Sequence, residues 1–175
     1  DVGDAVEALV DLDEADAGAD AQEHAAAIDL VGPHALAQFA GHALGRQRIG
    51  HITGPERFLA ARKRAEGFGA ALAAAGLRSR GGARFGEWSE PWGREAAGKL
   101  LADQPDTDAI FCGSDQIARG VADTLRAAGR AIPDDVALVG YDNWEPMALG
   151  AQPPLTSIDM RLEEVGRVAA GLLLT

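Results

Sequence analysis

The amino-acid sequence predicts an α/β protein in which helices cover both faces of a parallel β-sheet. Short apolar runs of strand length alternate along the chain with longer segments whose apolar residues recur every three or four positions. Several of the short runs end directly on polar side chains, which parallel strands bring together at one edge of a sheet. The sequence contains no internal repeat, heptad array or low-complexity linker that would favour another architecture. Strands separated by helices in this way form βαβ units.

The first part of the chain shows this alternation weakly. Residues 6–12 and 26–30 are weak strand candidates. Residues 33–44 predict a helix, because apolar side chains recur there at three- and four-residue steps, and Gly45 ends it.

The pattern becomes clearer from residue 48 onward. Residues 48–53 (RIGHIT) predict a strand that leads through Gly54 and Pro55 into a helix. One apolar stripe marks that helix, formed by Phe58, Ala61, Ala65, Phe68 and Leu72. Gly76 is placed to cap its end.

The alternation continues to the end of the chain. The predicted elements are a strand at 83–86, a helix at 94–103, a strand at 109–113, a helix at 115–128 and a strand at 136–141. A last helix is marked by the spacing of Leu162, Val165, Ala169 and Leu172.

Composition sets limits on the class of protein. With 175 residues, of which 47% are hydrophobic and 25% charged, the chain can bury a core as one domain or as two small lobes. The net charge is -11, and ten acidic residues with no Lys or Arg lie within residues 1–45. We interpret that acidic segment as a solvated surface. Direct nucleic-acid binding by this chain is not expected, because phosphate contacts require clustered Lys and Arg.

From the sequence we expect neither membrane insertion nor secretion. Apolar runs fall short of the ~20 residues that a membrane helix needs, and residues 1–10 carry no basic region ahead of an apolar one. Cys112 is the single cysteine, which excludes an internal disulfide and a cysteine-based zinc cluster. It stands in an apolar run and is expected to be buried.

Motifs for cofactors and catalysis are also absent. Neither glycine-rich phosphate-binding pattern occurs, and the four histidines show no pairing on one helix face. Ser114 lacks the neighbouring histidine and acid that would activate a nucleophile. We therefore expect no cofactor, no metal and no enzymatic activity.

A set of polar and aromatic residues suits a ligand with many hydroxyl groups. Arginine and aspartate provide paired donors and acceptors for neighbouring hydroxyls, and an aromatic face covers the apolar side of a sugar ring. Asp142 follows directly on a strand, Arg64 lies in a helical segment, and Trp88 and Trp92 flank a polar turn (GEWSEPWG). Each also has a structural interpretation: Arg64 as a solvated helix residue, Asp142 as a helix cap, Trp88 as part of the edge of the core.

Five segments occur in an order that matches a known family: ARKRAEGFGAALAAAGL, GEWSEPWG, GSDQIARG, VGYDNWEPM and PPLTSI. In this order and spacing they resemble the effector-sensing domain of lactose-repressor type bacterial transcription regulators. The resemblance extends from about residue 6 to the end of the chain. PPLTSI is the most family-specific string and matches the stretch that enters the connection between the two lobes of that domain.

The resemblance implies effector-binding roles for particular residues. The second arginine of its Arg pair, Arg64, is implied to contact effector hydroxyls, with Arg62 as a structural neighbour. Trp88 matches the tryptophan that stacks on the effector ring. Asp142 matches the effector-binding acid of the segment V-G-[FY]-D-[DN].

The resemblance implies two further effector-facing residues. Ser114 stands where the family motif A-N-D has asparagine, so a hydroxyl replaces an amide and its contact with the effector is expected to be altered. Asp11, in the strand-like run LVDL, matches another acid that faces the effector.

The fold implied is the two-lobed, type I periplasmic-binding-protein-like arrangement of parallel sheets flanked by helices. Residues 1–28 are assigned to part of the N-terminal lobe, 29–157 to the C-terminal lobe, and 158–175 to the crossover and return to the N-terminal lobe. The DNA-binding helix-turn-helix headpiece of the family and the first units of its N-terminal lobe have no counterpart in these residues.

The function implied is that of a cytoplasmic sugar sensor in a homodimeric regulator that reaches operator DNA through the headpiece. Two rivals remain from the sequence. A sugar-binding protein of a transport system shares the fold and is expected to carry a signal peptide. An enzyme of the doubly wound class is expected to carry a nucleophile or base with an orienting partner.

Overall fold

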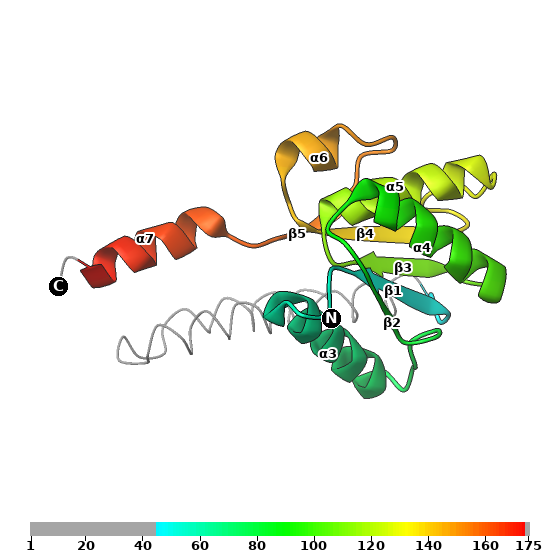
Figure 1. The fold of residues 1–175 in the computed structure, drawn as a ribbon, viewed down its shortest axis with the longest axis horizontal. Coiled ribbons are helices and arrows are strands. Elements are labelled where there is room, and N and C mark those ends of the chain that lie inside the picture. The colour runs from blue at the N-terminus through cyan, green and yellow to red at the C-terminus, as the bar shows by residue number, and fades with distance from the viewer. Residues whose placement is uncertain (1–44, 174–175) are drawn as a thin grey trace.

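The computed structural model describes residues 45–173 as one parallel five-stranded sheet with helices on both faces (Figure 1). The strands are β1 (Ile49–Thr53), β2 (Ala83–Phe85), β3 (Ala109–Cys112), β4 (Ala137–Asp142) and β5 (Thr156–Asp159). The helices are α3 (Leu59–Ala74), α4 (Glu90–Asp103), α5 (Asp115–Ala127), α6 (Glu145–Leu149) and α7 (Leu162–Leu173). The strand order is β2-β1-β3-β4-β5, and each neighbouring pair is parallel. The predicted α/β class is confirmed.

Some predictions fall on residues that the structure does not describe. The elements expected at residues 6–12, 26–30 and 33–44, and the candidate acid Asp11, lie outside the described residues.

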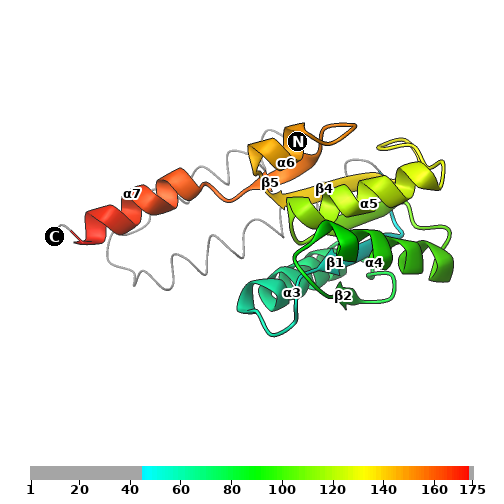
Figure 2. The same ribbon diagram turned by 45° about the horizontal axis from the view of Figure 1, so that its top comes forward.

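The sheet divides the core into two halves. Helices α4 and α5 cover one face and α3 covers the other, as the two views show (Figures 1 and 2). Successive strand residues point to opposite faces. In β1, Ile49 therefore packs in the core half under α3, while Ile52 packs in the half under α4 and α5. Cys112 is fully buried in the second half, as its apolar setting predicts.

Helices α4 and α5 approach each other closely because each carries a glycine at the crossing. A methyl group placed on Gly93 of α4 would lie 2.3 Å from the carbonyl oxygen of Ile117 in α5. One placed on Gly120 of α5 would lie 2.1 Å from the carbonyl oxygen of Glu90 in α4. Only hydrogen at these positions lets the two backbones touch.

The observed elements differ from the predicted ones in two ways: a capping residue sets the start of one helix, and two short elements were not predicted. Helix α4 begins at Glu90 rather than Arg94, because the Ser89 hydroxyl accepts from the backbone N–H of Trp92 at 3.3 Å and proline stands in the first turn. Helix α6 was not predicted, since five residues show no period. Strand β5 was not predicted either, because its residues are exposed or half-buried at the sheet edge.

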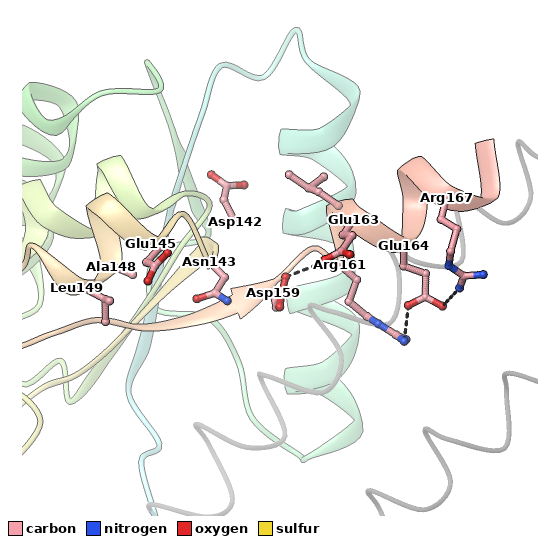
Figure 3. Close-up of a pocket in the computed structure, with 11 residues that line it drawn as sticks. Asp142, Asn143, Glu145, Ala148, Leu149, Asp159, Arg161, Glu163, Glu164 and Arg167 are labelled. Atoms are coloured by element: carbon pink, nitrogen blue, oxygen red, sulfur yellow. Dashed lines mark hydrogen bonds and ion pairs between the residues drawn. The ribbon is translucent and has the colours of Figure 1, made fainter. Parts of the chain in front are cut away.

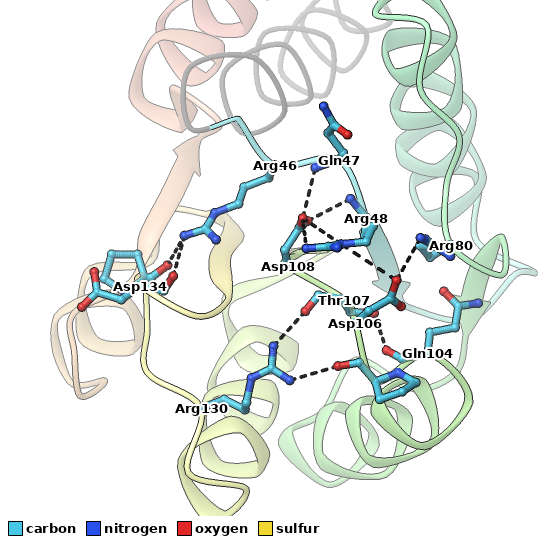
Figure 4. Close-up of polar contacts among 12 residues, drawn as sticks. Arg46, Gln47, Arg48, Arg80, Gln104, Asp106, Thr107, Asp108, Arg130 and Asp134 are labelled. Atoms are coloured by element: carbon cyan, nitrogen blue, oxygen red, sulfur yellow. Dashed lines mark hydrogen bonds and ion pairs between the residues drawn. The ribbon is translucent and has the colours of Figure 1, made fainter.

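The amino ends of the strands are joined by charged side chains (Figure 4). The Asp108 carboxylate accepts from the backbone N–H of Arg48 at 2.9 Å and forms an ion pair with its guanidinium at 3.1 Å. Arg130 donates to the carbonyl oxygens of Pro105 and Thr107, both at 3.1 Å. The charged side chains at this amino edge of the sheet therefore hold the loops there together.

Helix α7 extends away from the sheet, as both ribbon views show (Figures 1 and 2). It carries the exposed apolar side chains Leu162, Val165 and Leu173. No helix within residues 45–173 combines the length and the apolar character that a membrane crossing needs.

Candidate functional site

Two of the predicted ligand-binding residues meet at the carboxyl edge of the sheet. Arg64 comes from the middle of α3, and Asp142 is the last residue of β4. The Arg64 Nη2 atom lies 3.7 Å from Asp142 Oδ1. This ion pair is too long for a hydrogen bond, so both groups keep capacity for another partner.

Arg64 is a buried cation rather than a solvated helix residue. Its side chain is only 7% exposed, and Nη1 donates to the carbonyl oxygen of Gly113 at 2.7 Å. The guanidinium carbon lies 3.8 Å from the ring centre of Tyr141 and 5.5 Å from that of Trp88. The guanidinium therefore lies over two aromatic rings at the strand ends, a cation–π arrangement that suits its flat shape.

Trp88 lies beside Arg64 and against the backbone at the end of β1. A methyl group placed on Gly54 would lie 2.1 Å from the Trp88 indole, so the ring rests directly on this glycine. Trp88 also packs against the core half under α4 and α5, as its structural interpretation expected. The neighbouring Trp92 donates its Nε1–H to the carbonyl oxygen of Thr53 at 2.9 Å and fixes the same turn.

Asp142 sits in an unusual backbone conformation with a shifted acidity. Its φ is 110°, and that of Asn143 is 49°, a region that residues other than glycine seldom adopt. Burial raises the pKa of the Asp142 carboxyl to about 6, while the charge of Arg64 lowers it and the charge of Asp115 raises it further. The interpretation of Asp142 as a helix cap does not hold, since α6 has no side-chain cap hydrogen bond.

Ser114 is buried at the same edge and caps α5. Its hydroxyl oxygen accepts from the backbone N–H of Ile117 at 3.3 Å. The hydroxyl proton remains available as a donor. An altered contact between Ser114 and an effector therefore stays a prediction beside this structural role.

Asp142 also borders an open depression of about 910 Å³ between the β4–α6 turn and α7 (Figure 3). Its charged lining residues are Asp142, Glu145, Asp159, Glu163, Glu164, Arg161 and Arg167. Both arginines pair with Glu164, so the remaining charge of the depression is negative. Arg64, Trp88 and Ser114 do not line it. Asp142 therefore lies between two features: the cluster that contains Arg64 and Trp88, and the wider acidic depression.

In sequence, residues 40–175 match the periplasmic binding protein-like domain family. The chain belongs to this family.

Family members with known roles include the HTH-type transcriptional regulator CelR of Thermobifida fusca, 39% identical over 130 residues. That alignment covers 74% of this chain and 38% of CelR. The ribose operon repressor of Escherichia coli K12 is 37% identical over 131 residues, with 74% of this chain and 39% of the repressor covered. The chain thus spans about two-fifths of the length of these relatives, which are regulators rather than enzymes.

Solved structures of the family agree with the fold. A complex of the transcriptional regulator CelR with cellobiose superposes with a TM-score of 0.76 at 36% identity, covering 83% of this chain and 44% of that one. The lac repressor dimer bound to operator and the anti-inducer ONPF gives a TM-score of 0.76 at 26% identity, covering 83% and 50%. The resemblance to lactose-repressor type regulators is confirmed.

The candidate site also contains residues that the sequence analysis did not predict. Tyr141, which stacks on Arg64, was detectable in principle, because strand alternation places it on the α3 face. Gly113 and Met160 contact Arg64 through a carbonyl oxygen and a sulfur, and no sequence signal marks either contact. In the described part of the chain, no group of three or more His, Cys, Asp or Glu side chains is placed to hold a metal ion.

Proposed function

We propose that this chain is the effector-sensing part of a lactose-repressor type transcription regulator, and that the carboxyl edge of its sheet binds a sugar. One observation carries the proposal. A buried guanidinium and a carboxylate lie 3.7 Å apart beside an indole face, each with capacity for a further hydrogen bond. Sugars present neighbouring hydroxyls that donate and accept, on a ring with an apolar face.

Each residue has a role in this proposal. Arg64 donates to hydroxyl oxygens, Asp142 accepts from hydroxyl protons, and Trp88 covers the apolar face of the ring. Ser114 contributes its hydroxyl proton, and Asp11 is assigned a second carboxylate from the N-terminal lobe. The negative charge of the adjoining depression supports an uncharged sugar over a phosphorylated one.

The proposal also includes the domain assignment. Residues 29–157 form the C-terminal lobe, residues 1–28 belong to the N-terminal lobe, and residues 158–175 return to it. The boundary after residue 157 falls within β5, the strand that leads out of the sheet towards α7.

Regulation follows from the two lobes. A sugar that binds one relative orientation of the lobes more tightly shifts the population of molecules towards that orientation. The shift changes the affinity with which the headpieces of a homodimer bind operator DNA. We place this protein in the cytoplasm, without a cofactor and without catalytic turnover. The regulator names of its relatives support this choice over a transport protein.

A thermal-shift screen of monosaccharides and disaccharides, including cellobiose and ribose, tests the proposal. A sugar that binds only the folded protein at 100 times its Kd raises the unfolding free energy by about 2.7 kcal/mol. The Arg64→Ala protein should lose this shift. The Lys63→Ala protein should keep it, because Lys63 lies on the same helix and pairs at the surface with Glu66. A shift that survives Arg64→Ala would contradict the assigned site.

A further inference from the structure

Asp115 is a buried acid that has no role in the proposed sugar contacts. It is the first residue of α5 and is 1% exposed. Its Oδ2 atom accepts from the backbone N–H of Trp144 at 2.8 Å, and its Oδ1 atom accepts from the Ser157 hydroxyl at 2.5 Å. The Ser157 oxygen in turn accepts from the backbone N–H of Asn143 at 3.0 Å. The Asp115 carboxylate thereby fixes both amides that follow Asp142, one directly and one through a hydroxyl.

The turn held in this way needs external partners. Asp142 and Asn143 both have positive φ, a conformation that costs free energy for side chains larger than glycine. Such a conformation persists only where surrounding contacts determine it. The hydrogen bonds to Asp115 and Ser157 are contacts of that kind, and they come from α5 and β5.

Strand β4 is shaped to admit the Asp115 carboxylate. A methyl group placed on Gly140 would lie 2.2 Å from Asp115 Oδ1. The carboxylate therefore lies directly against the strand backbone just before the turn. The cap of α5 does not need Asp115, because Ser114 supplies it.

We propose that Asp115 is a positioning residue for effector recognition, which with Ser157 holds the turn of residues 142–144 so that the Asp142 carboxylate faces Arg64. This inference rests on the proposed function of Asp142. Asp115 contacts no effector atom in this account. It acts by keeping the turn in the conformation that presents Asp142.

Hydrogen exchange measured by NMR tests the positioning without any ligand. Ser157→Ala should speed exchange of the Asn143 amide, and Asp115→Ala should speed exchange of both Asn143 and Trp144. Asp115→Asn should restore protection of Trp144, because its amide oxygen can still accept. Unchanged protection of β4 amides shows that the fold is intact, and Asp123→Ala on the same helix is the control. Unchanged exchange of Asn143 and Trp144 in Asp115→Ala would overturn the proposal.

A double-mutant cycle in the full-length protein tests the link to the effector, with the sugars of the thermal-shift panel as probes. Asp115→Ala should weaken sugar binding on the order of 10- to 100-fold. In an Asp142→Ala background the same change should have little further effect, because Asp115 acts through Asp142. Additive losses would overturn the proposal. If Asp142→Ala leaves binding unchanged, the proposed function fails instead, and the exchange data still decide whether Asp115 holds the turn.

Discussion

The Arg64 guanidinium lies over the rings of Tyr141 and Trp88 and donates a hydrogen bond to a backbone carbonyl oxygen, and these contacts use its planar shape as well as its charge. Lysine carries the same charge on a flexible stem without a planar fork. At this position the two side chains are therefore not equivalent.

We predict that Arg64→Lys lowers sugar affinity about tenfold or more while leaving the fold intact, because the fork geometry is lost. Titration calorimetry measures the affinity and circular dichroism checks the fold. Arg62→Lys is the matched control, since Arg62 is exposed and donates to the Glu56 carbonyl oxygen. Equal affinity of the Arg64→Lys and native proteins would contradict the role of the fork.

The Asp142 carboxyl makes stability depend on pH. Its pKa rises from 3.8 to about 6 on folding, chiefly through burial, so the folded state binds the extra proton between these values. The stabilisation of the folded state that comes from this raised pKa is fully present below pH 3.8, and it is lost as pH rises through about 6. His51 acts in the opposite sense. Burial lowers its pKa to about 4, so its contribution to the stability of the folded protein is lost as pH falls towards that value.

We predict that Asp142→Asn is more stable than the native protein at pH 7.5 and that this advantage disappears at pH 4. Urea unfolding of both proteins at the two pH values measures the difference, and comparison at each pH cancels the contribution of His51. An advantage of equal size at both pH values would show that ionisation of Asp142 does not cause it.

At the scale of elements, the apolar pattern predicted the strands and helices between residues 48 and 142, because the helices bury one apolar face and β1, β3 and β4 are buried on both faces. It could not predict α6 or β5, which are too short or too exposed to carry a period. It placed the start of α4 late, because the first turn is specified by Ser89 and a proline rather than by apolar spacing.

The crossing of α4 and α5 depends on glycine in a way that a variant can test. We predict that Gly120→Ala lowers the free energy of unfolding by about 1 to 3 kcal/mol, because the added methyl must push the helix backbones apart. Gly98→Ala in α4 should raise it by up to about 1 kcal/mol, because nothing lies within 4 Å of that methyl group and alanine favours helix. Chemical denaturation measures both, and a neutral Gly120→Ala would contradict the close crossing.

At the scale of the whole molecule, the site joins residues that are distant in the sequence. The carboxyl-edge rule and the family resemblance predicted Arg64, Trp88 and Asp142, and the structure brings these three together. The sequence could not predict the burial of Arg64 or the hydrogen bonds by which Asp115 and Ser157 hold the turn after Asp142. Both arise from packing between α3, α5 and β5.

Sensing requires that the sugar and operator DNA affect each other's binding. We predict that a sugar found in the thermal-shift screen changes operator affinity of the full-length protein by roughly 5- to 150-fold, and that operator DNA changes sugar affinity by the same factor. Fluorescence anisotropy and calorimetry measure the two factors. Asp142→Asn should bind operator but lose the response. A sugar that binds without any change in operator affinity would argue against a regulatory role.

The proposed sensor binds a sugar at the carboxyl edge of the sheet through Arg64 and Asp142. A crystal structure of the full-length protein with the sugar from the screen tests it most directly. We expect a sugar ring against Trp88, with hydroxyl groups within hydrogen-bonding distance of the Arg64 guanidinium and the Asp142 carboxylate. A sugar bound elsewhere, with both side chains free of contact to it, would contradict the claim.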